Sequence, residues 1–148
     1  MPSIIFKGPA RYCKDRHEAK RGRRRFTPYR KRDEILLSIG FESYADYLTS
    51  PLWKLIRDAK IAVDPTCELC GLPAQEVHHI SYRKNVLIGK HQWSLLSVCC
   101  GCHKRIEFTE SGKKRTFYEV HSTVKRLLKA SGRWFAHTRK GAKKAGKQ

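Results

Sequence analysis

The chain has 148 residues, which suits one small domain with tails and one modest hydrophobic core. Its 32 Lys and Arg residues against 13 Asp and Glu residues give a net charge of +19, and such a surplus favours a polyanionic partner, of which nucleic acid fits best. No apolar run approaches the roughly 18 residues of a membrane span, and the N-terminal apolar patch is too short for a signal peptide, so we expect a cytoplasmic protein without a membrane partner.

Basic runs near both ends of the chain predict two extended arms. The first covers residues 20–32 and includes two aromatic residues, and the second covers residues 139–148 and is poor in apolar residues. Such runs repel themselves when alone and can lie along phosphates, although plain solubilising tails are the alternative. We predict a flexible arm over residues 1–32 and a tail over 133–148. The predicted DNA contacts are Arg21, Arg23, Arg24, Arg25, Arg30, Lys31, Arg32, Arg83 and Lys84.

The central domain is predicted to span residues 33–132 and to begin with short helical segments. Residues 33–40 contain a cluster of aliphatic residues and form a short helix or turn that ends at Gly40, where a left-handed cap is expected. Ser43 and Asp46 resemble a capping box with Asp in place of Glu. They predict a brief helix that ends at Leu48.

A longer helix is predicted over residues 51–63. Ser50 is a good cap residue, and Pro51 follows at the first helical position, where proline is favoured. The helix is expected to bury one stripe, because four apolar residues recur at helical spacing: Leu52, Ile56, Ala59 and Val63. Trp53 is expected in the core.

Two Cys-x-x-Cys pairs predict a structural zinc site: Cys67 with Cys70, and Cys99 with Cys102. A two-residue spacer lets two thiolates of one tight turn bind the same tetrahedral Zn²⁺. Cys100 leaves open a second pairing with Cys102, although a one-residue gap fits a shared ion less well. Buried free cysteines or disulfides are the other alternative, and nothing in the sequence indicates an oxidising compartment.

Two strands and a helix are predicted around this zinc. Residues 76–82 are rich in β-branched and aromatic residues and are typical of a strand, and residues 94–98 are its predicted partner. The run 103–108 has no helix breaker and predicts a short helix. Together with the cysteine turns, these segments define a predicted core over residues 67–110.

A last helix is predicted over residues 116–131, closed by Gly132. Its apolar face is traced by Phe117, Val120, Val124, Leu127, Leu128 and Ser131. His121 lies within this helix, and a lone helical histidine is more often solvated or satisfied than a ligand. The aromatic residues Trp134 and Phe135 follow, and they either pack back on the domain or stack on unpaired bases.

The order of these motifs resembles the HNH endonuclease family. The carrying features are the first Cys-x-x-Cys, the run from Val77 to Ile80 with its two histidines, and the second Cys-x-x-Cys followed by His103. The resemblance covers about residues 43–110 and includes the lead-in from Tyr44 to Trp53. It implies an α+β fold: a small zinc-stabilised ββα-metal core, flanked by helices, with basic N-terminal and C-terminal arms.

The resemblance also implies an activity, the metal-dependent hydrolysis of phosphodiester bonds in duplex DNA. His79 falls on the position of the general base, and His78 and His103 fall on ligands of a catalytic divalent metal such as Mg²⁺, Mn²⁺ or Ni²⁺. Imidazole, with a pKa near 6.5, can take a proton from water at neutral pH, and a cation offsets the charge that develops on the phosphate. Ser94 takes the place of the family's common Asn, and its hydroxyl makes fewer hydrogen bonds.

Two alternatives remain open for this region. Neighbouring residues of a regular strand point to opposite faces, so His78 and His79 serve one site only where the strand is twisted or bulged. Otherwise one histidine packs beside the zinc and the other is solvated. The alternative function is a zinc-stabilised DNA-binding protein whose catalytic centre is degenerate.

Overall fold

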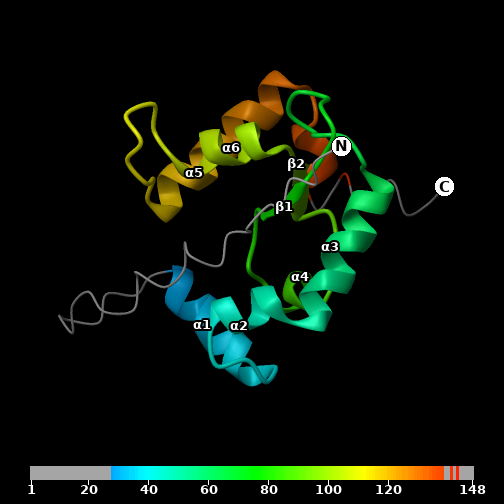
Figure 1. Ribbon diagram of the computed structural model, residues 1–148, viewed down its shortest axis with the longest axis vertical. Coiled ribbons are helices and arrows are strands. Elements are labelled where there is room, and N and C mark those ends of the chain that lie inside the picture. Colours follow the sequence, from blue (N-terminus) through cyan, green and yellow to red (C-terminus); the bar gives the residue numbers. More distant parts are fainter. Residues whose placement is uncertain (1–27, 139–140, 142, 144–148) are drawn as a thin grey trace, which may run out of the picture. The chain divides into compact units, whose positions relative to one another are not determined.

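The computed structural model of the protein describes residues 28–138, 141 and 143 (Figure 1). They form a mixed structure of helices and a two-stranded sheet, which confirms the predicted α+β class. The chain divides after Pro51 into two compact units. Arg21, Arg23, Arg24 and Arg25 lie outside the described residues, as does most of the predicted C-terminal arm, and the predicted domain limits stay predictions.

The first unit contains helices α1 (Pro28–Ser38) and α2 (Tyr44–Thr49). Helix α1 begins five residues earlier than the predicted segment, so the end of the predicted arm is helical. Gly40, at a φ of 93°, lies in the turn that closes α1, as expected. The Ser43 hydroxyl caps α2 by accepting a hydrogen bond from the Asp46 backbone N–H at 3.1 Å, and it donates to the Asp46 carboxylate at 2.7 Å.

Helix α3 (Pro51–Val63) begins where the sequence predicts, but its buried stripe differs. The buried residues are Trp53, Ile56 and Lys60, whereas the predicted Ala59 is exposed and Val63 is 70% exposed. The predicted stripe at these two positions is therefore wrong. Lys60 lies on the buried face in their place because it forms ion pairs with two carboxylates, described below. A pattern of apolar residues does not reveal such ion pairs.

The sheet pairs β1 (Glu76–His79) with β2 (Leu95–Val98) in antiparallel register, with His78 opposite Leu96. Strand β1 ends three residues before the predicted limit. Helix α4 (Lys84–Leu87), which the sequence analysis does not predict, lies in the connection between the two strands. β2 is buried along its whole length, and in β1 only Glu76 is half-buried.

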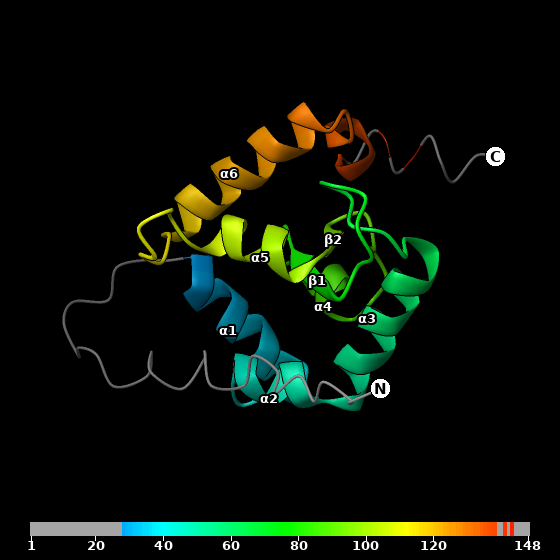
Figure 2. The same ribbon diagram turned by 45° about the horizontal axis from the view of Figure 1, so that its top comes forward.

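Helices α5 (Cys100–Glu107) and α6 (Phe117–Ala130) complete the core of the second unit, with α6 beside α5 (Figure 2). A hydrophobic cluster joins them to β2, and its members are Cys67, Leu96, Val98, Cys99, Cys102, Ile106, Val120, Val124 and Leu128. Thr116 and Glu119 form a full capping box at the start of α6. The predicted end of α6 is confirmed, because Gly132 has a φ of 73°.

A buried network of charged residues connects four segments of the second unit. The Glu68 carboxylate, 5% exposed, accepts from Lys60 Nζ at 2.9 Å and from the Ser97 backbone N–H at 2.9 Å. Its other oxygen accepts from His137 Nε2 at 2.6 Å. His137 lies in the short 3-10 helix η3 (Trp134–His137), and its Nδ1 bonds to the Trp93 carbonyl at 2.8 Å.

The neighbours of Glu68 keep its buried carboxyl ionised. Burial raises the pKa of the Glu68 carboxyl, but the hydrogen bond and charge of His137, followed by those of Lys60, outweigh burial and lower it to about 2. The two groups that His137 contacts, the Glu68 carboxylate and the Trp93 carbonyl, are both hydrogen-bond acceptors. Asp64 gives Lys60 a second carboxylate at 2.6 Å.

No helix in the described part of the chain has the length and apolar character that a membrane crossing requires. The segment after α6 returns to the core: Trp134 packs against the hydrophobic cluster, as one of the two sequence alternatives predicts. Phe135, the other aromatic of that segment, is 55% exposed.

Candidate metal centres

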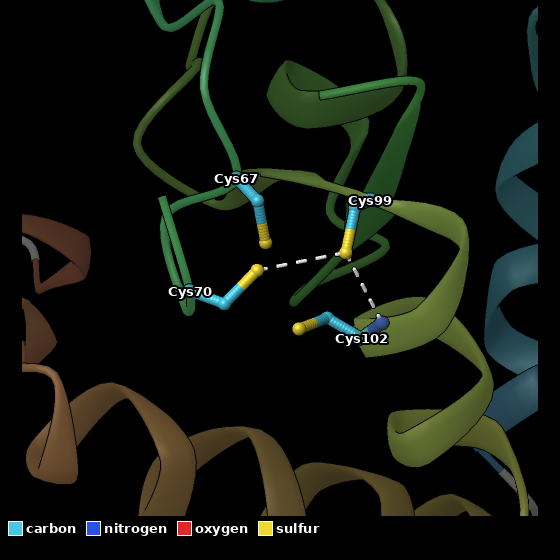
Figure 3. Close-up of side chains that lie close together, drawn as sticks. All are labelled: Cys67, Cys70, Cys99 and Cys102. Carbon is cyan, nitrogen blue, oxygen red and sulfur yellow. Dashed lines mark hydrogen bonds between the residues drawn. The ribbon is translucent and has the colours of Figure 1, made fainter. Parts of the chain in front are cut away.

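The four cysteines of the two Cys-x-x-Cys pairs converge in the second unit (Figure 3). Cys67 and Cys70 lie in the turn after α3, Cys99 follows β2, and Cys102 lies in α5. All four sulfurs are within 4.8 Å of one another, and the Sγ atoms of Cys70 and Cys99 are 3.6 Å apart. A tetrahedral ion with Zn–S bonds of 2.3 Å places sulfurs about 3.8 Å apart, so this arrangement fits a structural zinc.

Local backbone geometry forms both cysteine turns. In the first turn Gly71, at a φ of 80°, donates its N–H to the Cys67 carbonyl at 2.8 Å, and the Cys67 N–H donates to Leu72 at 2.6 Å. In the second turn Cys99 is the N-cap of α5, and its sulfur accepts from the Cys102 N–H at 3.4 Å. N–H groups that face sulfur stabilise thiolates, the form that binds metal.

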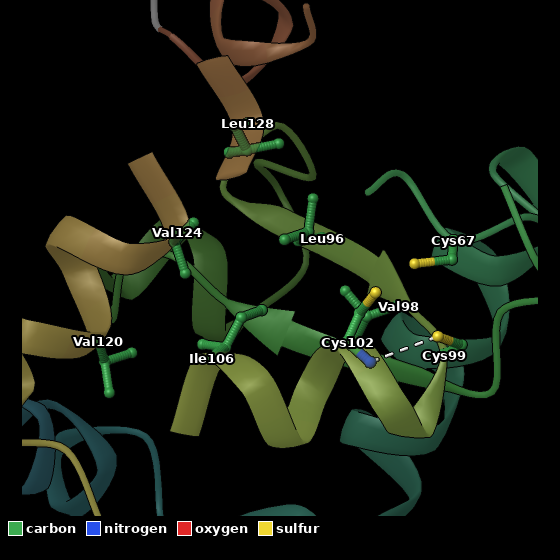
Figure 4. Packing of buried hydrophobic residues seen from close by; sticks show 9 residues of the cluster. All are labelled: Cys67, Leu96, Val98, Cys99, Cys102, Ile106, Val120, Val124 and Leu128. Carbon is green, nitrogen blue, oxygen red and sulfur yellow. Dashed lines mark hydrogen bonds between the residues drawn. The ribbon is translucent and has the colours of Figure 1, made fainter. Parts of the chain in front are cut away.

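The cysteines differ in acidity and exposure. Burial raises the pKa of the Cys67 thiol, but backbone hydrogen bonds from Cys99, Leu69 and Cys70 outweigh it and lower the value to about 7. Cys67, Cys99 and Cys102 belong to the hydrophobic cluster, as Figure 4 shows, whereas Cys70 is exposed. The candidate metal-binding sulfurs therefore extend from the hydrophobic core to the surface of the unit.

Cys100 lies outside this cluster. Its thiol bonds to the Glu76 carboxylate at 3.5 Å, and burial, followed by the charge of Glu76, raises the pKa of Cys100. The alternative pairing of Cys100 with Cys102 is therefore not the one that the structure shows. The structure brings together Cys99 and Cys102, the pair with the two-residue spacer.

A second cluster of potential metal ligands contains His78, His103 and Glu107, whose ligand atoms also lie within 4.8 Å of one another. His78 comes from β1, and the other two lie one turn apart on α5. His78 Nδ1 is 3.5 Å from Glu107 Oε1, and the rings of His78 and His103 are 5.5 Å apart. Two imidazoles and a carboxylate suit a divalent ion that keeps further positions for water or phosphate oxygens.

A carboxylate next to this cluster orients one of its histidines. Glu76 lies two residues before His78 on β1, so both side chains project from the same face of the strand. The Glu76 carboxylate bonds to His103 Nδ1, and this bond lowers the pKa of Glu76. A carboxylate on one ring nitrogen leaves the other, Nε2, available as a metal ligand.

His78 is buried in this cluster in its neutral form, which is the form that binds a metal ion. Burial, followed by the charges of His103 and His79, holds the pKa of His78 well below its usual range. The imidazole is therefore neutral near pH 7 and keeps a lone pair for an ion.

His79 lies on the other face of β1. Its ring stacks on Trp53 at 4.4 Å and on Tyr82 at 5.4 Å, and it is 5% exposed. The strand has ordinary alternation, so the two histidines have different surroundings. The alternative in which one of them is solvated is wrong, since both are buried.

The remaining predicted site residues are dispersed. Ser94 is buried, its hydroxyl has no hydrogen-bond partner among the described residues, and its carbonyl accepts from the Ile80 N–H at 2.8 Å. Arg83 and Lys84 are exposed at the start of α4. On α1, Arg30 pairs with Glu34, Lys31 is exposed, and Arg32 pairs with Asp33 while its guanidinium lies 4.1 Å from the Tyr44 ring centre.

Two acidic residues are not among the predicted site residues: Glu107 of the second cluster and Glu76 next to it. The available signals were the helical i, i+4 spacing from His103 to Glu107 and the strand alternation from Glu76 to His78. Comparison of the chain with protein-family models, curated proteins and solved structures finds no match.

Proposed function

We propose that the protein is a metal-dependent DNA endonuclease of HNH type that hydrolyses phosphodiester bonds. The observation that carries the proposal is the cluster of His78, His103 and Glu107. Its residues come from strand β1 and helix α5, within the ββα unit that also carries the candidate structural zinc site, and the family resemblance implies such a unit. The net charge of +19 supports a nucleic-acid substrate.

In this proposal His78, His103 and Glu107 hold a divalent ion, which when bound offsets the charge developing on the scissile phosphate. Glu76 orients His103 through its hydrogen bond. The family resemblance makes His79 the proposed base. Its ring lies on the opposite face of β1 from His78, so base catalysis at this ion requires a local twist of the strand. Its stacking between Trp53 and Tyr82 fixes the orientation of its ring.

The burial of His79 and Ser94 favours a second candidate function, a zinc-stabilised DNA-binding protein with a degenerate catalytic centre. A base must reach the water that it activates, and His79 is 5% exposed. Ser94 is 1% exposed and stands where the resemblance implies an Asn. Nuclease activity distinguishes the two functions.

We expect purified protein to nick supercoiled plasmid when Mg²⁺, Mn²⁺ or Ni²⁺ is added. His79→Ala should lower the nicking rate by about 10²-fold or more, because general-base catalysis contributes that much. His103→Ala and Glu107→Gln should also abolish nicking while DNA binding persists.

His91→Ala is the matched control, because His91 is an exposed histidine of the same unit and belongs to neither metal cluster. It should nick as the wild type does. Unchanged nicking in His79→Ala would remove His79 from the role of base. Tight DNA binding without nicking in any of the three ions would favour the DNA-binding protein.

A second expected result concerns the proposed N-terminal arm. Residues 1–27 contain nine Lys and Arg residues, and their removal keeps α1 intact. We expect the truncated protein to bind every duplex more weakly and to lose about 3 units or more of the slope of log affinity against log salt, since each phosphate contact contributes about 0.9. Fluorescence anisotropy at several salt concentrations measures this slope, and an unchanged slope would show that the segment is not a DNA-binding arm.

A further inference from the structure

Five aromatic side chains from four segments of the second unit form a row, here called the aromatic stack: Trp53, His79, Tyr82, Phe117 and His121. Successive ring centres are 4.4, 5.4, 6.5 and 6.4 Å apart. The first, second and last pairs are nearly parallel, at 27°, 24° and 10°, and the Tyr82–Phe117 pair is tilted by 41°. These distances are in the range of favourable aromatic pairs.

The aromatic stack runs from the core to the surface. Trp53 and His79 are buried, Phe117 is half-buried and His121 is exposed. Tyr118 extends this outer end: its ring lies edge-on to Phe117 at 5.6 Å and 88°, and the residue is 71% exposed. Core packing accounts for the inner rings but not for the exposed Tyr118 and His121 beside them.

Basic residues are neighbours in the chain of two rings of the stack, Tyr82 and Phe117. Arg83 and Lys84 follow Tyr82 in the chain and are exposed. A second basic group precedes Phe117 and consists of Lys113, Lys114 and Arg115. Aromatic rings beside cations are the combination that holds unpaired nucleotides, because bases stack on the rings and phosphates meet the charges.

The outer end also lies close to the second metal cluster. The Arg115 backbone N–H donates to the Glu107 carbonyl at 2.8 Å, and Lys114 Nζ is 3.9 Å from the Glu107 carboxylate. Phe117 is two residues beyond Arg115. A base stacked there would place its phosphates within a few residues of the ligands that hold the proposed ion.

We propose that Tyr118 and His121, at the outer end of the aromatic stack, bind an unpaired nucleobase. The inference has a consequence that rests on the proposed nuclease function. The preferred substrate carries an extrahelical or single-stranded nucleotide beside the bond that is cut. The surrounding cations select a polyanionic strand over a neutral aromatic ligand.

The test is binding of full-length protein to three oligonucleotides of one sequence: a perfect duplex, a duplex with one extrahelical 2-aminopurine, and the single strand. No catalytic ion is added. We expect the extrahelical base and the single strand to bind more tightly than the duplex at equal salt, with quenching of 2-aminopurine fluorescence. Tyr118→Ala should weaken binding of both by about 5-fold or more, whereas Tyr118→Phe should not.

Phe135→Ala is the matched control, because Phe135 is an exposed aromatic outside the stack. It should bind as the wild type does. The salt slope of Tyr118→Ala should stay unchanged, since no charge is removed. Equal affinity of wild type and Tyr118→Ala for the unpaired substrates, or an equal loss on the perfect duplex, overturns the inference.

Binding to single-stranded DNA and to RNA of the same sequence shows which nucleic acid supplies the base. Weaker binding of Tyr118→Ala to either one supports the site. Binding is measured without a catalytic ion, so a protein without nuclease activity can still bind the unpaired base. Conversely, nicking without any dependence on Tyr118 for binding would sustain the proposed nuclease and reject this site.

Discussion

Replacing Cys67, Cys99 or Cys102 by Ser is expected to unfold the second unit, and metal analysis of the wild type should return close to one tightly held zinc per chain. These three residues belong to the hydrophobic cluster, so an empty site leaves polar groups within the core. Zinc in such sites contributes about 10 to 16 kcal/mol of apparent binding free energy. Small domains have about 5 to 15 kcal/mol of total stability, so loss of the ion exceeds what the fold can absorb.

Cys100→Ser is the matched control for the zinc prediction, because Cys100 lies next to a ligand in the chain but outside the cluster. It should retain one zinc and a cooperative thermal transition. Circular dichroism and metal content, measured on the same samples, check both outcomes. A folded, zinc-loaded Cys99→Ser together with an unfolded Cys100→Ser would reverse the pairing.

Glu68→Ala is expected to lower the free energy of unfolding by about 3 to 5 kcal/mol, the cost of breaking a buried ion pair. The substitution leaves Lys60 and His137 facing each other with their shared carboxylate removed. The backbone N–H of Ser97 also loses its acceptor. Urea unfolding of zinc-loaded protein measures the change.

Glu110→Ala, at an exposed glutamate of the same unit, should change stability by less than about 0.5 kcal/mol. If Glu68→Ala lowers the free energy of unfolding by no more than Glu110→Ala does, the network does not stabilise the fold.

The contribution of Glu68 should also depend on pH in a defined direction. Its pKa is about 2 in the folded protein against an ordinary value of 4.5, so its stabilisation is complete above pH 4.5 and is lost as the pH falls towards 2. The stability difference between wild type and Glu68→Gln should therefore shrink as the pH falls below 4.5. A difference that vanishes already at pH 5.5 contradicts this assignment.

Local signals explain the parts of the fold that could be predicted. Proline at the start of α3, serine before α2 and the glycines after α1 and α6 each act through their own backbone or a neighbour a few residues away. The cysteine spacing likewise identifies all four members of the zinc cluster, because the turn that aligns each pair is local.

The parts that could not be predicted depend on partners distant in the chain. Lys60 is buried because Glu68 and Asp64 neutralise it, and His137 reaches Glu68 across 69 residues. Neither residue belongs to an apolar pattern. Helix α4 has only four residues, which is too short for a helical period to be recognised.

At the candidate second site, the histidines could be predicted from the sequence and the carboxylates could not. His78 and His103 followed from the family resemblance. Glu107 became a candidate only when α5 placed it one turn from His103 and opposite β1.

Cys99 is both a member of the four-cysteine cluster and the N-cap of α5, so the proposed zinc and the start of this helix depend on one residue. Helix α5 has eight residues, fewer than the roughly 12 to 15 that an isolated helix needs in water. Without zinc, no rigid helix holds His103 and Glu107 on the same face of α5. In the proposed nuclease, zinc must therefore load before the catalytic ion, and a zinc-starved cell would lose activity even where magnesium or manganese is plentiful.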